Sequence, residues 1–150
     1  MKKVMLVEDE EFILQGIRYI IDWEEIAMEV TSMAHNGKEA LEMFRQEPAD
    51  IVVTDVEMPL MNGLDLLEEI RKISPRTRFL ILSGYDEFEY ARKALKLDVE
   101  EYILKRIKIL EMTILMKDLC TCGKPTICSA GTGGPIFPMQ GSSARYICAM

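Results

Sequence analysis

Five side chains capable of chemistry each stand directly after an apolar run of the chain. They are Glu8, Asp9, Asp55, Ser83 and Lys105. Asp55, which follows the β-branched run IVVT, is the clearest case. Asp is a poor strand residue, and a buried strand rarely ends on a charge unless something compensates that charge. These residue types therefore indicate a shared polar site at the ends of buried strands.

Three of the five side chains are carboxylates, which repel one another when they are brought together. Two such charges ~4 Å apart repel by about 4 kcal/mol at an effective dielectric of 20. A hard divalent cation removes this conflict, and Mg²⁺ takes oxygen ligands octahedrally and is often shared with phosphate oxygens. We expect Glu8, Asp9 and Asp55 to supply carboxylates to Mg²⁺, with a backbone carbonyl of the following loop completing the set.

A carboxylate beside Mg²⁺ can also attack a phosphoryl group and form an aspartyl phosphate. Because phosphoryl transfer depends mostly on positioning and charge stabilisation, Lys105 would balance the phosphoryl charge and Ser83 would donate a hydrogen bond to it. Taken singly, Lys105 also fits a surface ion pair and Ser83 a strand-end cap. Glu8 and Asp9 also fit solvated loop acids. Their joint occurrence at strand ends favours the functional set.

Short apolar strands alternate with amphipathic helices along residues 2–105. The strands are expected over residues 3–7, 28–34, 51–54, 78–83 and 101–105. The helices are expected over residues 12–21, 37–46, 64–73 and 87–97, and one face of the first is expected to consist of Phe12, Ile13, Gly16, Ile17, Ile20 and Ile21. Strict alternation with strands apolar on both faces predicts an α/β fold, a parallel sheet covered by helices on both sides. Five strands favour the flavodoxin-like doubly wound order 2-1-3-4-5, in which ligands bind at the carboxyl ends of the strands.

Composition limits the class of protein. The chain has 150 residues, with 25 Asp and Glu against 18 Lys and Arg and a net charge of −7. This balance argues against a nucleic-acid surface spread over the chain and suits a module that binds cations or basic partners. The N-terminal apolar run is too short for a signal peptide, and no run has membrane-spanning length. We therefore expect a cytoplasmic protein without membrane contact.

The last part of the chain differs in character from the rest. Residues 106–119 make a mediocre last helix, and residues 119–150 contain no Asp or Glu but four Cys, five Gly and three Pro. We therefore divide the chain into a domain at 1–118 and a tail at 119–150 that we expect to be poorly ordered. We expect the tail to result from a frame slip in, or truncation of, a longer regulator. The alternative is a small appendage docked on the domain. The four Cys match no familiar zinc spacing and are expected to be reduced thiols.

Four segments together resemble the receiver domain of bacterial two-component response regulators. They are MLVEDEE, AHNGKEALEMF, IVVTDVEMPLMNGLDLLEEIR and FLILSGYDEFEYARKALKLDVEEYILK. The segments IIDWEEIAMEV and LSGYDEFEYARKA are similar to receivers of the YesN type, which are usually joined to an AraC-type helix-turn-helix output domain. The resemblance thus implies a response regulator linked to transcription regulation.

The resemblance also implies a role for seven residues. Asp55 corresponds to the phosphoryl acceptor, Glu8 and Asp9 to the acidic pair that holds Mg²⁺, Glu57 to the residue whose backbone carbonyl binds the same ion, Ser83 to the switch hydroxyl, Tyr102 to the aromatic switch and Lys105 to the family's lysine. On sequence alone, Tyr102 fits a core residue equally well.

The family mechanism follows from this correspondence as an expectation. The phospho-His of a sensor histidine kinase donates its phosphoryl group to Asp55, Ser83 moves towards it and Tyr102 rotates inward. The surface formed by residues 87–97, 101–105 and 106–119 then changes its partner preference, with a homodimer as one outcome. Such a protein is a switch with at most slow self-dephosphorylation, not a turnover enzyme.

One position departs from the family pattern, which has Lys-Pro after the fifth strand with the peptide bond in cis. Here Lys105 is followed by Arg106. A cis bond before a residue other than proline costs about 2.5–4 kcal/mol, so we expect a trans bond and an altered path after Lys105.

Two other classes of function remain as alternatives. A Mg²⁺-dependent phosphatase of the haloacid-dehalogenase kind also uses an Asp at a strand end, but it carries a second Asp two residues later, where this chain has Glu57. A truncated AraC-type DNA-binding regulator would lack its output domain. Direct nucleic-acid binding is not expected, because the tail has only two basic residues, Lys124 and Arg145, too few to contact a row of phosphates.

Overall fold

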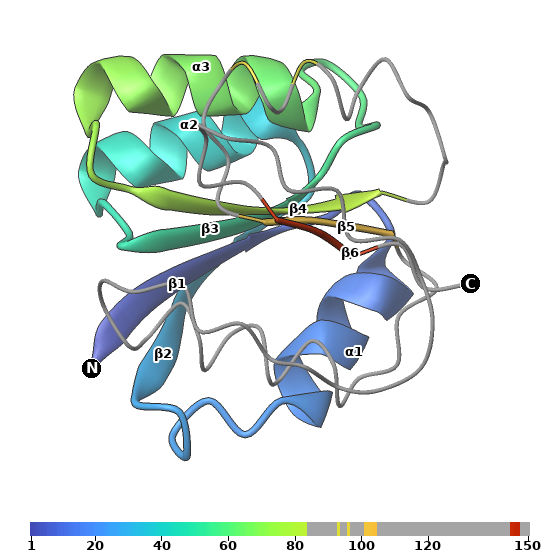
Figure 1. The fold of residues 1–150 in the computed structure, drawn as a ribbon, viewed down its shortest axis with the longest axis vertical. Helices are drawn as coiled ribbons and strands as arrows, with labels where there is room; N and C mark the ends of the chain where they lie inside the picture. The colour runs from blue at the N-terminus through green and yellow to red at the C-terminus, as the bar shows by residue number, and fades with distance from the viewer. Residues whose placement is uncertain (84–92, 94–95, 97–100, 105–144, 148–150) are drawn as a thin grey trace.

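The computed structural model of the protein describes residues 1–83, positions 93 and 96, and the backbone of residues 101–104 and 145–147. Its strands are β1 (Lys2–Val7), β2 (Met28–Ala34), β3 (Ile51–Asp55), β4 (Arg78–Ser83), β5 (Glu101–Leu104) and β6 (Arg145–Ile147). Its helices are α1 (Glu11–Ile20), α2 (Gly37–Gln46) and α3 (Gly63–Ile73). Figure 1 shows α2 and α3 on one side of the sheet and α1 on the other.

All neighbouring strands are parallel, in the order β2-β1-β3-β4-β5-β6. The first five have the predicted doubly wound order, so the predicted fold class is confirmed. The carboxyl ends of these parallel strands meet at one edge of the sheet, which we call the carboxyl rim.

The sixth strand was not expected from the sequence. Arg145–Ile147 lies beside β5, with Tyr146 opposite Tyr102 in register. Three residues are too few to show a two-residue periodicity, so the sequence carries no signal for this strand. The remainder of the tail, the predicted helix over 106–119 and most of the helix over 87–97 lie outside the described residues.

Alternating residues of β1, β3 and β4 supply two hydrophobic cores, one on each side of the sheet. Met5, Val7 and Val52 pack with Phe44 of α2 and Ile70 of α3 in the first core. The second core joins alternate residues of β1, β3 and β4 to the α1 side, and it includes Val4, Leu6, Ile51, Val53, Leu80, Leu14 and Trp23. Burying one large aliphatic side chain contributes roughly 1.5–3 kcal/mol, so the two cores hold the strand ends in a fixed arrangement.

The apolar face assigned to the first helix from the sequence is partly wrong. Leu14 is the buried residue of α1, whereas Phe12 is 90% exposed and Ile20 is 50% exposed. Leu14, Ile17 and Ile21 follow one another at helical spacing and face the sheet, and Phe12, two residues before Leu14, therefore points the other way.

Two asparagines start the helices that border the carboxyl rim. The Asn36 side chain accepts a hydrogen bond from Glu39 N at the start of α2. The Asn62 side chain accepts from Leu64 N at 2.9 Å and from Asp65 N at 2.8 Å at the start of α3. An N-cap of this kind stabilises a helix by about 1 kcal/mol, and here it also fixes where the preceding loop ends.

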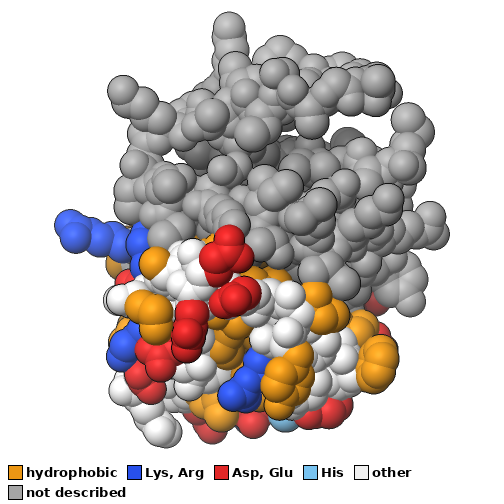
Figure 2. Space-filling view, turned by 90° about the horizontal axis from the view of Figure 1, so that it is seen from below, with side chains coloured by type: hydrophobic (Ala, Val, Ile, Leu, Met, Phe, Trp, Pro, Cys, Tyr) orange, Lys and Arg blue, Asp and Glu red, His pale blue; other side chains and the backbone are white. Residues whose placement is uncertain are grey.

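The described surface carries the acidic balance of the composition. Figure 2 shows Asp and Glu side chains running together across the middle of one face, with Lys and Arg at separate points. No helix among the described residues is both long and apolar enough to cross a bilayer.

Candidate functional site

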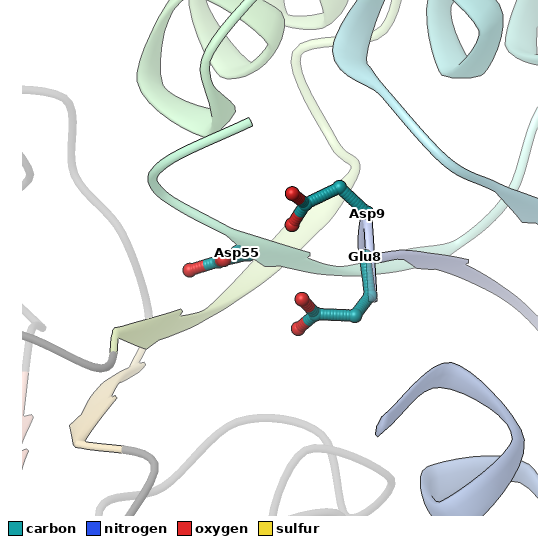
Figure 3. A group of neighbouring side chains, drawn as sticks. All are labelled: Glu8, Asp9 and Asp55. Carbon is teal, nitrogen blue, oxygen red and sulfur yellow. The ribbon is translucent and has the colours of Figure 1, made fainter. Parts of the chain in front are cut away.

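The acidic side chains predicted to form a site lie together at the carboxyl rim. Val7 of β1 pairs with Thr54 of β3, so the residues that follow, Glu8 and Asp55, emerge next to each other. One carboxylate oxygen from each of Glu8, Asp9 and Asp55 lies within 4.8 Å of the others. Figure 3 shows the Glu8 and Asp9 side chains extending from the end of β1 towards the side on which Asp55 leaves β3. The structure thus brings together the three acids that the sequence selected.

Two of these acids are buried, which strengthens their mutual interaction. Glu8 is 1% exposed and Asp55 is 6% exposed, whereas Asp9 is exposed. Buried charges are screened less than surface charges, so the three carboxylates create a strongly negative position. A small divalent cation with oxygen preference matches both this charge and this set of donors.

The backbone around Asp55 fixes the direction of its carboxylate. Asp55 Oδ1 accepts a hydrogen bond from Val56 N at 2.7 Å. The Thr54 hydroxyl donates to the Asp55 backbone oxygen at 2.9 Å. A Cβ added to Gly63 would collide with that same backbone oxygen, so the start of α3 packs directly on the acceptor residue.

The other predicted site residues are described to different extents. Ser83 is buried at the end of β4, one residue beyond Leu82, which pairs with Asp55. Tyr102 lies in β5 opposite Ile81, but only its backbone is described. Lys105, together with the peptide bond that follows it, lies outside the described residues, so the predicted trans bond and altered path stay predictions.

Glu57 lies in the loop of residues 56–62 between β3 and α3, which we call the acceptor loop. Its side chain is exposed, as expected for a residue assigned a role through its backbone carbonyl. The loop is closed at its base by a hydrogen bond from Gly63 N to Val56 O at 2.9 Å. A second segment, at Gly37, also contacts this loop. The sequence carries no signal for that contact.

The only histidine of the chain belongs to a separate polar cluster next to the rim. His35 Nε2 lies 2.6 Å from Glu11 Oε2, and His35 N donates to Glu39 Oε2 at 2.8 Å. The hydrogen bond with Glu11 raises the pKa of His35 above its ordinary value. Hydrogen bonds from Gln15 and then from His35 lower the pKa of Glu11. His35 lies in the loop between β2 and α2, and it links α1 to the start of α2.

Comparison with known proteins gives a consistent family. The family model described as response regulator receiver domain matches residues 4–117. The uncharacterized transcriptional regulatory protein YesN of Bacillus subtilis (strain 168) is 44% identical over 105 residues, which cover 70% of this chain and 28% of that protein. The transcriptional regulatory protein HptR of Staphylococcus aureus (strain NCTC 8325) is 34% identical over 116 residues, covering 77% of this chain and 45% of HptR. The chain thus spans less than half the length of these two relatives.

Solved structures resemble the chain over most of its length. The REC domain of AraT, a response regulator from Geobacillus stearothermophilus, is 38% identical with a TM-score of 0.72, covering 79% of this chain and 94% of that domain. The two component transcriptional regulator AraC from Clostridium phytofermentans is 27% identical with a TM-score of 0.69, covering 79% and 90% of the two chains. On the family match, supported by these relatives and by the order of the first five strands, the chain belongs to the response regulator receiver domain family.

Proposed function

We propose that Asp55 of this receiver accepts a phosphoryl group from the phospho-His of a sensor histidine kinase, with Mg²⁺ held by Glu8, Asp9 and Asp55. The single observation that carries this proposal is the gathering of three carboxylates within 4.8 Å at the ends of two adjacent strands. Two of them are buried, so their charges need a compensating cation more than surface acids do.

The donor set fits Mg²⁺ and leaves room for the phosphoryl group. All donors are oxygens, and Mg²⁺ usually keeps several positions for water and phosphate oxygens. The backbone carbonyl of Glu57 supplies a further ligand. When bound, the ion neutralises negative charge on the transferring phosphoryl oxygens.

In the transfer step, an oxygen of the Asp55 carboxylate forms a bond to phosphorus while the bond from phosphorus to the donor histidine nitrogen breaks. The released imidazole takes up a proton. The hydrogen bond from Val56 N holds the Asp55 carboxylate at a fixed angle, which reduces the entropy cost of reaching the reactive geometry. The Ser83 hydroxyl then donates a hydrogen bond to a phosphoryl oxygen, and Lys105 balances the added charge. Water slowly hydrolyses the aspartyl phosphate afterwards.

The signal leaves the domain through the surface that includes β5. Ser83 pairs with Leu104, and Tyr102 lies two residues earlier on the same strand, so a movement of Ser83 is transmitted to β5. We propose that this changes pairing through the surface of residues 87–97, 101–105 and 106–119, with homodimerisation as one outcome. Relatives named as transcriptional regulatory proteins support a role in transcription regulation, which we propose takes place in the cytoplasm and without nucleic-acid contact by this chain.

The test is incubation of the full chain with a small phosphodonor such as phosphoramidate and Mg²⁺, followed by intact mass measurement. Wild type is expected to gain one phosphoryl group that is base-labile, and Asp55→Asn is expected to gain none. Chelating the Mg²⁺ should abolish the adduct in wild type. Equal adduct yields in wild type and Asp55→Asn would show that the acceptor is another residue.

A further inference from the structure

The acceptor loop is attached to the domain at two places. Its base is closed by the hydrogen bond from Gly63 N to Val56 O. Its far part is held from another segment of the chain, because Gly37 N, at the start of α2, donates to Met61 O at 3.2 Å. Within the loop, Met61 N donates to Pro59 O at 2.8 Å.

Between these bonded residues, Leu60 has a backbone conformation that needs support from its neighbours. Its φ is 69°, in the left-handed region that a residue with a Cβ rarely adopts. The Leu60 side chain is 81% exposed, so side-chain burial does not compensate for this conformation. The hydrogen bonds of Pro59 and Met61 hold the turn, and one of them comes from Gly37, outside the loop. Met58 and Met61 also pack against the first core.

Gly37 can approach Met61 only because it has no side chain. A Cβ at position 37 would lie 2.5 Å from Met61 O, 2.8 Å from Met61 Cγ and 2.9 Å from Met61 Cβ. The nearest of these atoms belongs to the backbone and cannot rotate away. Any side chain at this position therefore forces the start of α2 and the loop at Met61 apart.

The displacement cannot be absorbed at the base of the loop. Gly63 packs on the backbone oxygen of Asp55, and Val56 is bonded to both Asp55 Oδ1 and Gly63. Movement at Met61 is thus taken up between residues 57 and 62, the part that carries the Glu57 carbonyl.

We infer that Gly37 is a positioning residue for the Mg²⁺ site: through the Met61 carbonyl it holds the acceptor loop so that the Glu57 carbonyl faces the carboxylates of Glu8, Asp9 and Asp55. The inference rests on the proposed function and adds to it a residue from a different element. Partners that orient metal ligands in this way typically change metal affinity 10–100-fold when they are altered.

The test compares Gly37→Ala with Gly16→Ala in the full chain. Gly16 is a matched control, because a Cβ there would meet only Ile20 Cδ1 at 3.9 Å. Titration calorimetry with Mg²⁺ should show a dissociation constant about tenfold higher in Gly37→Ala and a change below about twofold in Gly16→Ala. Phosphoramidate labelling of Gly37→Ala should fall at low Mg²⁺ and return to the wild-type yield at saturating Mg²⁺, a recovery that general damage to the fold would not produce.

A second measurement uses the wild-type protein and so does not depend on the variant folding. Coupling is reciprocal, so Mg²⁺ should slow hydrogen exchange of the Gly37 amide, while the Gly16 amide serves as the internal reference. Wild-type Mg²⁺ affinity in folded Gly37→Ala, or unchanged Gly37 exchange on adding Mg²⁺, would overturn the inference. If wild type itself bound no Mg²⁺, or if Asp55→Asn were still labelled, the proposed function would fail first.

Discussion

Replacing Asp55 with Asn should stabilise the domain without Mg²⁺ and remove most of the stabilisation that Mg²⁺ provides. Asn has nearly the same shape as Asp, and its side-chain oxygen can still accept the hydrogen bond from Val56 N. The substitution therefore removes one charge from the buried acidic cluster while keeping the shape of the side chain and this hydrogen bond.

The magnitude follows from the spacing of the carboxylates. The carboxylate oxygens of Glu8, Asp9 and Asp55 lie at most 4.8 Å apart. At this distance, two unit charges repel by about 3.5 kcal/mol at an effective dielectric of 20. Because Asp9 is exposed, solvent screens part of this repulsion, so we expect a rise of roughly 1–2 kcal/mol in the free energy of unfolding. For wild type, Mg²⁺ at 100 times its dissociation constant should add about 2.7 kcal/mol.

Urea unfolding with a chelator and again with Mg²⁺ measures both quantities, and equal slopes would show that only stability changed. Glu42→Gln is the control, since it removes one negative charge from an exposed position on α2, and it should change stability by less than about 0.5 kcal/mol. The reasoning is refuted if Asp55→Asn is less stable than wild type in the chelator, or if Mg²⁺ stabilises both proteins equally.

Three further perturbations test other parts of the structure. Leu14→Ala should lower the free energy of unfolding by about 2–5 kcal/mol, whereas Phe12→Ser should change it by less than about 0.5 kcal/mol. Similar urea midpoints for the two variants would contradict the assigned buried face of α1. Asn62→Ala should cost about 1 kcal/mol through loss of the α3 cap, again by urea unfolding, and a neutral result would mean that its two bonds are replaced by water. The pKa of His35, read by NMR from this single histidine, should fall towards its ordinary value in Glu11→Gln. The native pKa of His35 is raised and that of Glu11 is lowered, so the pair stabilises the fold at pH values between the two. This stabilisation is lost as pH rises through the pKa of His35 or falls through the pKa of Glu11.

Elements with a clear local signal were predicted with nearly correct bounds. The strands over 28–34 and 78–83 and the helix over 37–46 match the structure residue for residue. The strand over 78–83 is a continuous apolar run, the helix over 37–46 has apolar residues at helical spacing, and Asn36 caps that helix. The acidic site was predictable for a related reason, since parallel strands deliver the residues at their carboxyl ends to one rim.

Features that depend on distant contacts or on very short segments were not predictable. The exposed Phe12 is as apolar as a core residue, so composition alone placed it on the wrong face of α1. The left-handed Leu60 is not a Gly or Asn, and its conformation is held by a contact from Gly37 that no local pattern reveals. The roles of Tyr102 and Lys105 stay predictions, because their side chains lie outside the described residues.

The parallel direction of β6 has a practical consequence for labelling the protein. Since β6 runs alongside β5, the chain leaves it at Ile147 on the same rim as Asp55, whereas β1 begins at Lys2 on the opposite rim. A fluorophore attached at Ile147 would start on the acceptor's rim, with β4 and β5 between it and Asp55. An affinity tag or surface anchor belongs at the N-terminus, where it leaves the acceptor open to a kinase.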